Sequence, residues 1–327
     1  MKRRDFLRST TAAGLLSVLD PAYLVAKEKL AAGQTPTGPL ERRTYGRTQE
    51  QLSIIGFGGI LVMNATPQES AEFVAKAVER GVNYFDVAPS YGNAQDRLGP
   101  ALKPHRDKCF LACKTAKRDA AGARQELETS LKALETDHFD LYQLHALTTV
   151  EEVEQAFAPG GAMETVVKGR EEGKVRYIGF SAHDEEAALL ALERFDFDSV
   201  LFPLGFPTWI KGEFGPALHK RALEAGRGIL ALKAMAHRKW PAQSQAADRR
   251  WQKAWYEPFD TVDKVALGLR FTLHLPVTAM ITPGHWELFQ MALDLAQAGA
   301  LTPLNDSERK VAEEIASTSD PIFSRHA

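Results

Sequence analysis

The 327-residue chain has few of the residues that build disulfide scaffolds, fibres and membrane spans. Its 2 cysteines exclude a disulfide framework and a cysteine-ligated iron–sulfur cluster. No uncharged apolar run of about 18 residues follows the N-terminal segment, which excludes a polytopic membrane protein. The 24 glycines and 17 prolines are scattered, which excludes collagen-like architecture. A net charge of −2 leaves no basic surplus for binding nucleic acid.

The N-terminal segment has the pattern of an export signal. Arg3 and Arg4 precede Phe6-Leu7, and the run Ser9–Leu19 is uncharged and mildly apolar. This pattern resembles the twin-arginine signal, which the export machinery recognises and which is no membrane anchor. The apolar run is too short for a stable transmembrane segment. The alternative is a basic amphipathic N-terminal helix.

The chain divides into three parts on this interpretation. Residues 1–32 are predicted to be the export signal, with cleavage after Ala26 or Ala32. Residues 33–40 are rich in glycine, proline and threonine and are predicted to be a linker. Residues 41–327 form the folded domain, and the protein is predicted to be exported to the periplasm.

From about residue 40 the pattern alternates between short apolar runs and longer stretches with helical spacing. The predicted strands are Ile54–Gly58, Asn83–Asp86, Cys109–Lys114, Phe139–Leu144, Arg176–Phe180, Ser199–Phe202, Gly228–Leu232 and Val277–Ile281. The predicted helices cover 67–80, 93–102, 120–135, 162–172, 184–194, 213–226, 261–272 and 285–298. Eight such units in about 250 residues predict an α/β fold, the (β/α)8 TIM barrel.

Segments outside these units complete the predicted architecture. A small hairpin at Glu41–Leu52 precedes the barrel, and a surface helix at Asn305–Ser317 follows it. A doubly wound open sheet is the competing fold, but no G-x-G-x-x-G follows the first strand. Cys109 and Cys113 lie four residues apart in one predicted strand, about 13 Å in extended chain, so they cannot form a disulfide with each other.

Chemically active side chains gather at the ends of strands two, three and four. Asp86 ends strand two and Tyr91 follows it, Lys114 ends strand three, and His145 ends strand four. In a parallel barrel these C-terminal ends share one rim, where function concentrates. Each side chain alone has a structural explanation, such as a helix cap or a packing residue. Together they form a set suited to proton transfer.

Several long motifs in the right order resemble the aldo-keto reductase family. They are G-R-T at 46–48, G-F-G-G at 56–59, G-V-N-Y-F-D-V-A-P-S-Y-G at 81–92, S-L-K-A-L-E-T-D-H-F-D-L-Y-Q-L-H at 130–145 and G-K-V-R-Y-I-G-F-S at 173–181. The resemblance extends from Glu41 to about Ala300. It implies NAD(P)H-dependent interconversion of a carbonyl and an alcohol, with a small-molecule substrate.

The resemblance assigns the family's catalytic tetrad to Asp86, Tyr91, Lys114 and His145. Reduction of a carbonyl produces an alkoxide that needs a proton, and Tyr91 would supply it. A phenol has an ordinary pKa near 10, which a nearby ammonium lowers, so Lys114 is expected to assist Tyr91. Asp86 would hold Lys114 charged, and His145 would donate a hydrogen bond to the developing oxyanion.

Cofactor contacts follow the family only in part. Ser181 is kept, but Ala182 stands where the family has asparagine, and Leu201 stands where it has glutamine. His183 is two residues beyond Ser181, so the two share a face of an extended strand and His183 could replace the missing amide contact. The predicted cofactor-binding residues are Gly58, Gly59, Asp86, Ser181, His183, Lys233, Thr282, Pro283 and Gly284.

The family resemblance implies NADP(H), and NAD(H) remains possible. Gly284 at a helix start offers backbone N–H groups to a phosphate. The stretch from Thr282 to Glu287 contains no lysine or arginine, only His285. A cation there would pair with a 2′-phosphate, so its absence predicts a weak preference for NADPH over NADH.

An insertion at Ala236–Pro258 carries Trp240, Trp251, Trp255 and Tyr256. These rings either close over the substrate or pack the insertion onto the barrel, and the sequence leaves both alternatives open.

The leading functional hypothesis is an exported NAD(P)H-dependent oxidoreductase of the aldo/keto reductase type. The alternative is a cofactor-binding barrel with a sensing or regulatory role and weak turnover, favoured by Ala182 and Leu201. A pure binding protein would not need all four groups of the tetrad. A hydrolase is disfavoured because paired carboxylates and histidine-rich metal ligands are missing from successive strand ends.

Overall fold

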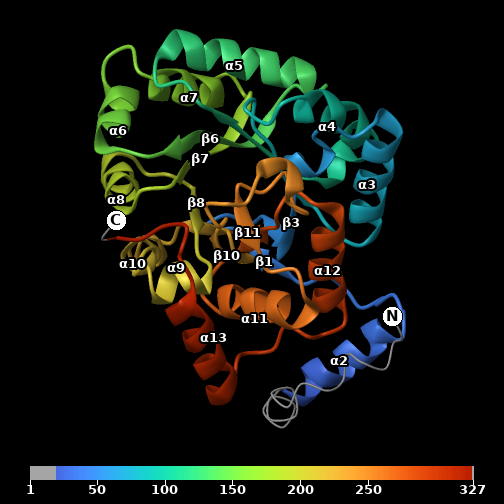
Figure 1. Ribbon diagram of the computed structural model, residues 1–327. Helices are drawn as coiled ribbons and strands as arrows, with labels where there is room; N and C mark the ends of the chain where they lie inside the picture. The colour runs from blue at the N-terminus through green and yellow to red at the C-terminus, as the bar shows by residue number, and fades with distance from the viewer. Residues whose placement is uncertain (1–19, 326–327) are drawn as a thin grey trace.

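The computed structural model describes residues 20–325, and eight of its strands close into a parallel barrel with helices around it (Figure 1). The barrel strands are β3 (Ile55–Gly58), β4 (Tyr84–Asp86), β5 (Phe110–Thr115), β6 (Phe139–Leu147), β7 (Val175–Ala182), β8 (Ser199–Pro203), β9 (Gly228–Leu232) and β12 (Ala279–Ile281). They follow one another in chain order, and β12 closes the ring between β9 and β3.

Helices surround the strands; α2 precedes the first strand, and the other helices come later in the chain. They are α2 (Pro21–Ala31), α3 (Pro67–Glu79), α4 (Ala94–Leu102), α5 (Ala120–Ala133), α6 (Val150–Phe157), α7 (Ala162–Glu171), α8 (Glu185–Arg194), α9 (Phe206–Ile210), α10 (Pro216–Glu224), α11 (Val262–Leu273), α12 (Trp286–Gln297) and α13 (Asp306–Thr318). Short 3-10 helices are η2 (Gly59–Val62), η3 (Lys103–Lys108) and η4 (Ala246–Asp248).

The predicted barrel is confirmed, with each predicted strand present and in the predicted order. The short helices α6 and α9 were not predicted. Cys109 and Cys113 are free, which agrees with the prediction that they do not bond to each other, and both are buried. Within the described residues, no helix is long and apolar enough to cross a membrane.

Two hydrophobic layers separate the inside of the barrel from its outside. The larger cluster lies between strands and helices, and the smaller one fills the barrel interior. At the N-terminal end of the strands, Tyr45 is fully buried in the interior cluster. Its ring packs edge-on against Phe110 at 5.2 Å, and its hydroxyl donates a hydrogen bond to Ser199 Oγ at 2.6 Å. Because side chains fill the N-terminal end of the barrel, a ligand site is expected at the opposite, C-terminal end.

Two antiparallel hairpins lie outside the barrel sheet. The first pairs β1 (Arg42–Thr44) with β2 (Gln51–Ser53), which confirms the predicted N-terminal hairpin. The second pairs β10 (Ala236–Lys239) with β11 (Tyr256–Pro258) and forms the base of the insertion after β9. In Figure 1 the labels β10 and β11 lie within the ring of helices.

Helix α2 comes from the segment predicted to be part of the export signal, yet it packs on the barrel. Tyr23 is 1% exposed, and its hydroxyl donates a hydrogen bond to Asp263 at the start of α11. The ring lies over the guanidinium of Arg270, 5.6 Å from the centroid, and Arg270 forms a buried ion pair with Glu308 of α13.

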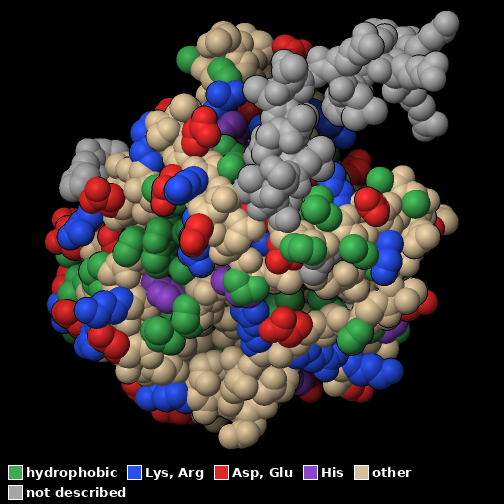
Figure 2. Space-filling view, turned by 90° about the horizontal axis from the view of Figure 1, so that it is seen from below, with side chains coloured by type: hydrophobic (Ala, Val, Ile, Leu, Met, Phe, Trp, Pro, Cys, Tyr) green, Lys and Arg blue, Asp and Glu red, His purple; other side chains and the backbone are tan. Residues whose placement is uncertain are grey.

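On the face shown in Figure 2, acidic and basic side chains are interspersed.

Replacing Tyr23 with alanine should therefore destabilise the folded protein. We expect the free energy of unfolding to fall by about 2–3 kcal/mol. This is less than the usual loss for a fully enclosed aromatic side chain, because α2 can detach from the barrel while the rest stays folded. Tyr23→Phe should cost about 1 kcal/mol, the hydrogen bond to Asp263 alone. Urea denaturation measures both. Val25, which is 51% exposed, provides a control: Val25→Ala should change stability by less than about 0.5 kcal/mol. An unchanged midpoint for Tyr23→Ala would show that α2 is no part of the folded unit.

Candidate active site

A cavity of about 190 Å³ opens among the C-terminal ends of the barrel strands. All but one of the site residues predicted from the sequence line it: Gly58, Asp86, Tyr91, Lys114, His145, Ser181, His183, Lys233, Thr282, Pro283 and Gly284. The exception is Gly59, where an added Cβ would lie 2.6 Å from Val87. Gly59 therefore serves the close packing of η2 on the end of β4 and does not face the cavity.

Lys114 and Asp86 form a buried ion pair at the base of the cavity. Lys114 is 0% exposed and Asp86 2%. The ammonium donates to Asp86 Oδ1 and, at 3.2 Å, to the carbonyl of Val87. Burial alone would lower the pKa of Lys114, but the charge of Asp86 raises it overall. Lys114 is thus held as a cation at neutral pH.

Two further side chains orient Asp86, and the sequence analysis missed both. Gln143 donates to Asp86 Oδ2 at 3.1 Å, and the Tyr84 hydroxyl donates to the same oxygen at 3.4 Å. Gln143 is two residues before His145 in β6, and Tyr84 is two before Asp86 in β4. Residues two apart in a strand share a face, so this spacing was the signal that could have identified them.

Tyr91 lies in the turn between β4 and α4, where Gly92 adopts a positive φ of 56°. Its ring packs edge-on against His145, with centroids 5.6 Å apart, and the ammonium of Lys114 lies 5.4 Å from the ring centroid. Burial raises the pKa of the Tyr91 phenol, and Lys114 offsets only part of the increase. The expected lowering by Lys114 is therefore outweighed by burial, and Tyr91 is protonated at neutral pH.

His145 projects from β6 as a neutral imidazole. Burial and then the positive charge of Lys114 lower its pKa to about 3. Its Nδ1 lies 3.4 Å from the hydroxyl of Ser90, and its carbonyl accepts a hydrogen bond of 2.7 Å from Arg118. A neutral imidazole offers one N–H donor without a full charge. Tyr91 and His145 together present two neutral donors to the cavity.

Ser181 and His183 both line the cavity from the end of β7, as their spacing predicted. The Ser181 oxygen accepts a hydrogen bond of 2.8 Å from the Ala146 N–H, which fixes this side chain. His183 stacks on Phe323, with ring centroids 5.1 Å apart, and burial lowers its pKa to about 4. Leu201 lines the cavity from β8 and offers no hydrogen bond.

The aromatic insertion divides its rings between the two roles that the sequence left open. Trp255 and Tyr256 line the cavity. Trp240 and Trp251 instead hold the insertion, since their indole N–H groups donate to the Ala254 carbonyl at 2.9 Å and to Asp260 at 3.1 Å. Two aromatic rings of the insertion thus line the site, and the other two stabilise the conformation of the insertion.

Lys253, which the sequence analysis did not single out, brings a cation to the turn after β12. Its backbone N–H donates to the His285 ring at 3.1 Å, and its ammonium donates to the carbonyls of Ile60 at 3.3 Å and Leu61 at 3.1 Å. It lines the cavity beside Gly284. A cation from the insertion thus lies near residues 282–287, which contain no lysine or arginine.

Thr282 is an unsatisfied polar group in the same turn. It is 6% exposed, and its hydroxyl has no hydrogen-bond partner within the described residues. A buried hydroxyl without a partner costs free energy unless a ligand or water satisfies it. At Gly284 an added Cβ would come within 2.2 Å of Ile60, so only glycine fits there. Thr282, Gly284 and Lys253 together fit a ligand with anionic oxygens.

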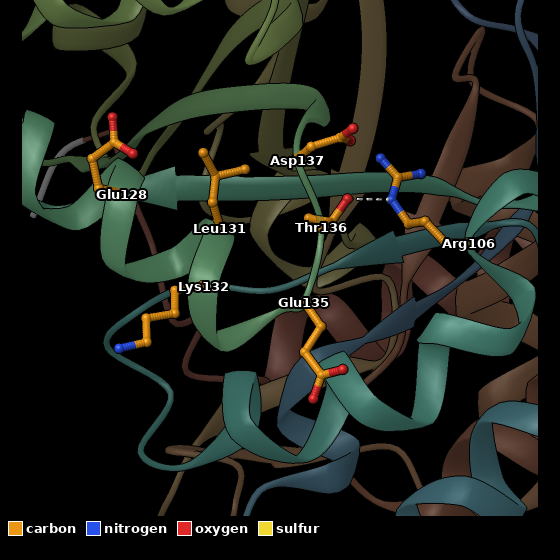
Figure 3. A pocket seen from close by; sticks show the side chains of 7 residues that line it. All are labelled: Arg106, Glu128, Leu131, Lys132, Glu135, Thr136 and Asp137. Carbon is orange, nitrogen blue, oxygen red and sulfur yellow. Dashed lines mark hydrogen bonds between the residues drawn. The ribbon is translucent and has the colours of Figure 1, made fainter.

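A second depression lies at the opposite, N-terminal end of the strands (Figure 3). Arg106 there donates to Thr136 at 3.0 Å and forms an ion pair with Asp140 at 2.9 Å. Its guanidinium is already engaged, so this depression lacks the unsatisfied groups of the cavity at the barrel mouth. Within residues 20–325, no group of three His, Cys, Asp or Glu is placed to hold a metal ion.

The fold and this cavity define a class: a (β/α)8 barrel with a tyrosine, a histidine and a lysine–aspartate pair at its mouth. The sequence model of the Aldo/keto reductase family matches residues 54–201. The match covers just under half of the chain, which over these residues is similar to aldo/keto reductases, a family of oxidoreductases.

Individual proteins show the same similarity. An uncharacterized oxidoreductase, YqkF of Bacillus subtilis, is 21% identical over 314 residues, which cover 88% of this chain and 99% of the relative. The aldo-keto reductase YhdN of the same organism is 34% identical over 138 residues, but the match covers only 40% of that relative. The solved structure of aldo-keto reductase AKR11C1 from Bacillus halodurans has the same fold, with a TM-score of 0.66, 22% identity and coverage of 88% of this chain and 99% of that one.

Proposed function

We propose that the protein reduces an aldehyde or ketone to an alcohol, or catalyses the reverse reaction, with a nicotinamide dinucleotide as redox partner. The observation that carries this proposal is the convergence of Tyr91, His145 and the buried Lys114–Asp86 pair on one cavity. The family similarity supports it, because aldo/keto reductases as a family carry out NAD(P)H-dependent carbonyl reduction.

The residues of the cavity account for the proton in this reaction. As the carbonyl carbon is reduced, its oxygen takes up the electron pair of the π bond and becomes an alkoxide. Tyr91 is protonated and donates its phenolic proton to that oxygen, while the N–H of His145 stabilises the charge as it develops. Lys114 then stabilises the tyrosinate, and solvent returns the proton. In the reverse direction the same tyrosinate accepts the alcohol proton.

The cavity fits a dinucleotide through its lining residues, among which the Thr282 hydroxyl has no hydrogen-bond partner within the described residues. Thr282, Gly284 and Lys253 would hold its phosphates, and Ser181 and His183 would contact its carboxamide. When bound, the reduced nicotinamide supplies the hydride. At Gly58, an added Cβ would lie 3.0 Å from a methyl group of Ile281, so a larger residue would crowd this part of the cavity. We propose NADP(H) as the dinucleotide on the strength of the family similarity.

Lys253→Met tests the phosphate end of this site. Removing a charge-assisted hydrogen bond costs about 1.5–3 kcal/mol, so we expect dinucleotide affinity to fall at least about tenfold. Titration of the reduced dinucleotide, followed by its fluorescence, measures this. A larger loss for NADPH than for NADH would assign Lys253 to the 2′-phosphate, and equal losses would assign it to the pyrophosphate. Lys132→Met, on the depression of Figure 3, is the matched control. Unchanged affinity for both dinucleotides would contradict this role.

The proposed activity has a simple assay. Purified protein with NADPH and a panel of small aldehydes should consume the reduced dinucleotide, and the absorbance of the dihydronicotinamide follows the reaction. No consumption with any aldehyde or ketone, and no reverse reaction with the matching alcohols, would count against the proposal.

We further propose that the chain is exported to the periplasm by the twin-arginine machinery. This proposal depends on Arg3 and Arg4 with Phe6-Leu7, which lie outside the described residues. The packing of α2 favours a mature protein that keeps residues 20–32, so that any cleavage falls before Asp20. A reporter fused after residue 35 should reach the periplasm, and replacing both arginines with lysine should prevent it. Periplasmic signal from the lysine variant would overturn the proposal.

A further inference from the structure

Lys233 presents an unpaired cation to the cavity. It follows the last residue of β9 and adopts a positive φ of 64°, which is uncommon for a residue with a side chain. Within residues 20–325 its ammonium makes no hydrogen bond and no ion pair. It lies instead over two aromatic rings, 5.4 Å from the centroid of Trp255 and 4.9 Å from that of Tyr256. The backbone is thus in an uncommon conformation at a residue whose charge is met, within residues 20–325, by aromatic rings and by no carboxylate or hydrogen-bond acceptor.

The charges around the cavity do not compensate Lys233. Three ammonium groups line it, those of Lys114, Lys233 and Lys253, against the single carboxylate of Asp86. That carboxylate is engaged by Lys114, and Lys253 is engaged by two carbonyls. His183 beside Lys233 is neutral. A ligand that brings a negative charge to this part of the cavity would therefore be favoured.

Lys233 lines the same cavity as Tyr91 and His145. Its positive charge contributes to the lowered pKa values of both His183 and His145. Burial lowers its own pKa to about 8, which leaves it mostly protonated at neutral pH. The ring of Tyr256, which is 4% exposed, shields one side of the ammonium from water and would strengthen an ionic contact made there.

We propose that Lys233 binds a carboxylate of the substrate, so that the preferred substrates are small oxo acids whose carbonyl reaches Tyr91 and His145. This inference rests on the proposed reductase function and specifies its substrate class. Phosphates of a dinucleotide are the other source of anionic oxygens. They have their own site at Thr282, Gly284 and Lys253, where an unsatisfied hydroxyl and a glycine turn match a phosphate, whereas Lys233 is framed by aromatic rings.

Matched substrates distinguish a substrate carboxylate from a dinucleotide phosphate as the anionic group that Lys233 binds. The pairs are ω-oxo acids of two to five carbons, such as 4-oxobutanoate, and the corresponding neutral ω-oxo amides. For the best pair we expect kcat/KM of the acid to exceed that of the amide at least about tenfold, the value of one hydrogen bond to a charged group. In Lys233→Met this ratio should fall to within about threefold of one, chiefly through KM of the acid. Partial unfolding of the variant would lower the activity on both substrates equally, so it would not change this ratio.

Two outcomes would overturn the proposal. One is a parent protein that shows no preference for any acid over its amide. The other is a Lys233→Met variant that loses dinucleotide affinity and keeps the acid preference, because Lys233 would then hold a phosphate. Calorimetry with 4-hydroxybutanoate and 4-hydroxybutanamide, each added to the parent and to Lys233→Met, tests the carboxylate contact without turnover. Selective binding of the hydroxy acid by the parent alone would support the contact even if no aldehyde is reduced, so failure of the proposed function would remain distinguishable.

Discussion

Replacing Tyr91 with phenylalanine is expected to lower kcat at least about 100-fold, because the proposed proton donor is lost and general acid catalysis contributes about 100- to 10,000-fold. The phenyl ring keeps the edge-on contact with His145 at 5.6 Å, so the fold and the dinucleotide site should persist. Steady-state kinetics with a small aldehyde and a dinucleotide titration measure the two effects separately. The expected signature is a loss in kcat with little change in dinucleotide affinity.

Tyr177→Phe provides the matched control for this change. Tyr177 packs around Tyr45 and Phe110 at the far end of the barrel, away from the cavity. Removing the Tyr177 hydroxyl should leave kcat close to that of the parent protein. If Tyr91→Phe also stayed within twofold of the parent, Tyr91 would not be the proton donor.

Lys114→Met should reduce both activity and stability. Without the ammonium, the carboxylate of Asp86 remains buried and unpaired, which typically costs about 3–5 kcal/mol. The tyrosinate at Tyr91 also loses its nearby cation, so we expect kcat to fall at least about 100-fold. Thermal denaturation and steady-state kinetics measure the two losses.

A double variant distinguishes these two roles of Lys114. Adding Asp86→Asn to Lys114→Met removes the uncompensated charge, so most of the stability should return. Activity should stay low, because no cation stands beside Tyr91. Recovery of activity together with stability would show that Lys114 acts only through the fold and has no part in proton transfer.

Much of the architecture could be predicted from the sequence because parallel strands and helices alternate with clear signals. The tetrad residues could be placed together because strand ends in a closed parallel barrel meet at one rim. Lys253 could not be placed, since it comes from an insertion whose β10–β11 pairing brings it back to the turn after β12. The pKa of Tyr91 depends on how burial balances the charge of Lys114, which no motif encodes.

The packing of α2 on the barrel could not be predicted from the sequence of the N-terminal segment. A short apolar stretch after a basic start has the pattern of an export signal, but the same residues can also form an amphipathic helix. Tyr23 and Ala26 are each 1% exposed in α2, so this part of the segment packs against the folded domain. Tyr23 contacts α11, and α2 packs against α12; both helices are far away in the sequence, and local composition does not reveal these contacts.

The transfer of a labelled hydride tests the proposed reductase function most directly. NADPH carrying deuterium at both positions of the nicotinamide C4 is incubated with the protein and a small aldehyde, and the alcohol product is examined by mass spectrometry. The proposed function predicts one deuterium on the carbinol carbon of the alcohol, with the hydroxyl proton drawn from solvent through Tyr91. An alcohol without deuterium, or no alcohol with any aldehyde or ketone of the panel, would contradict it.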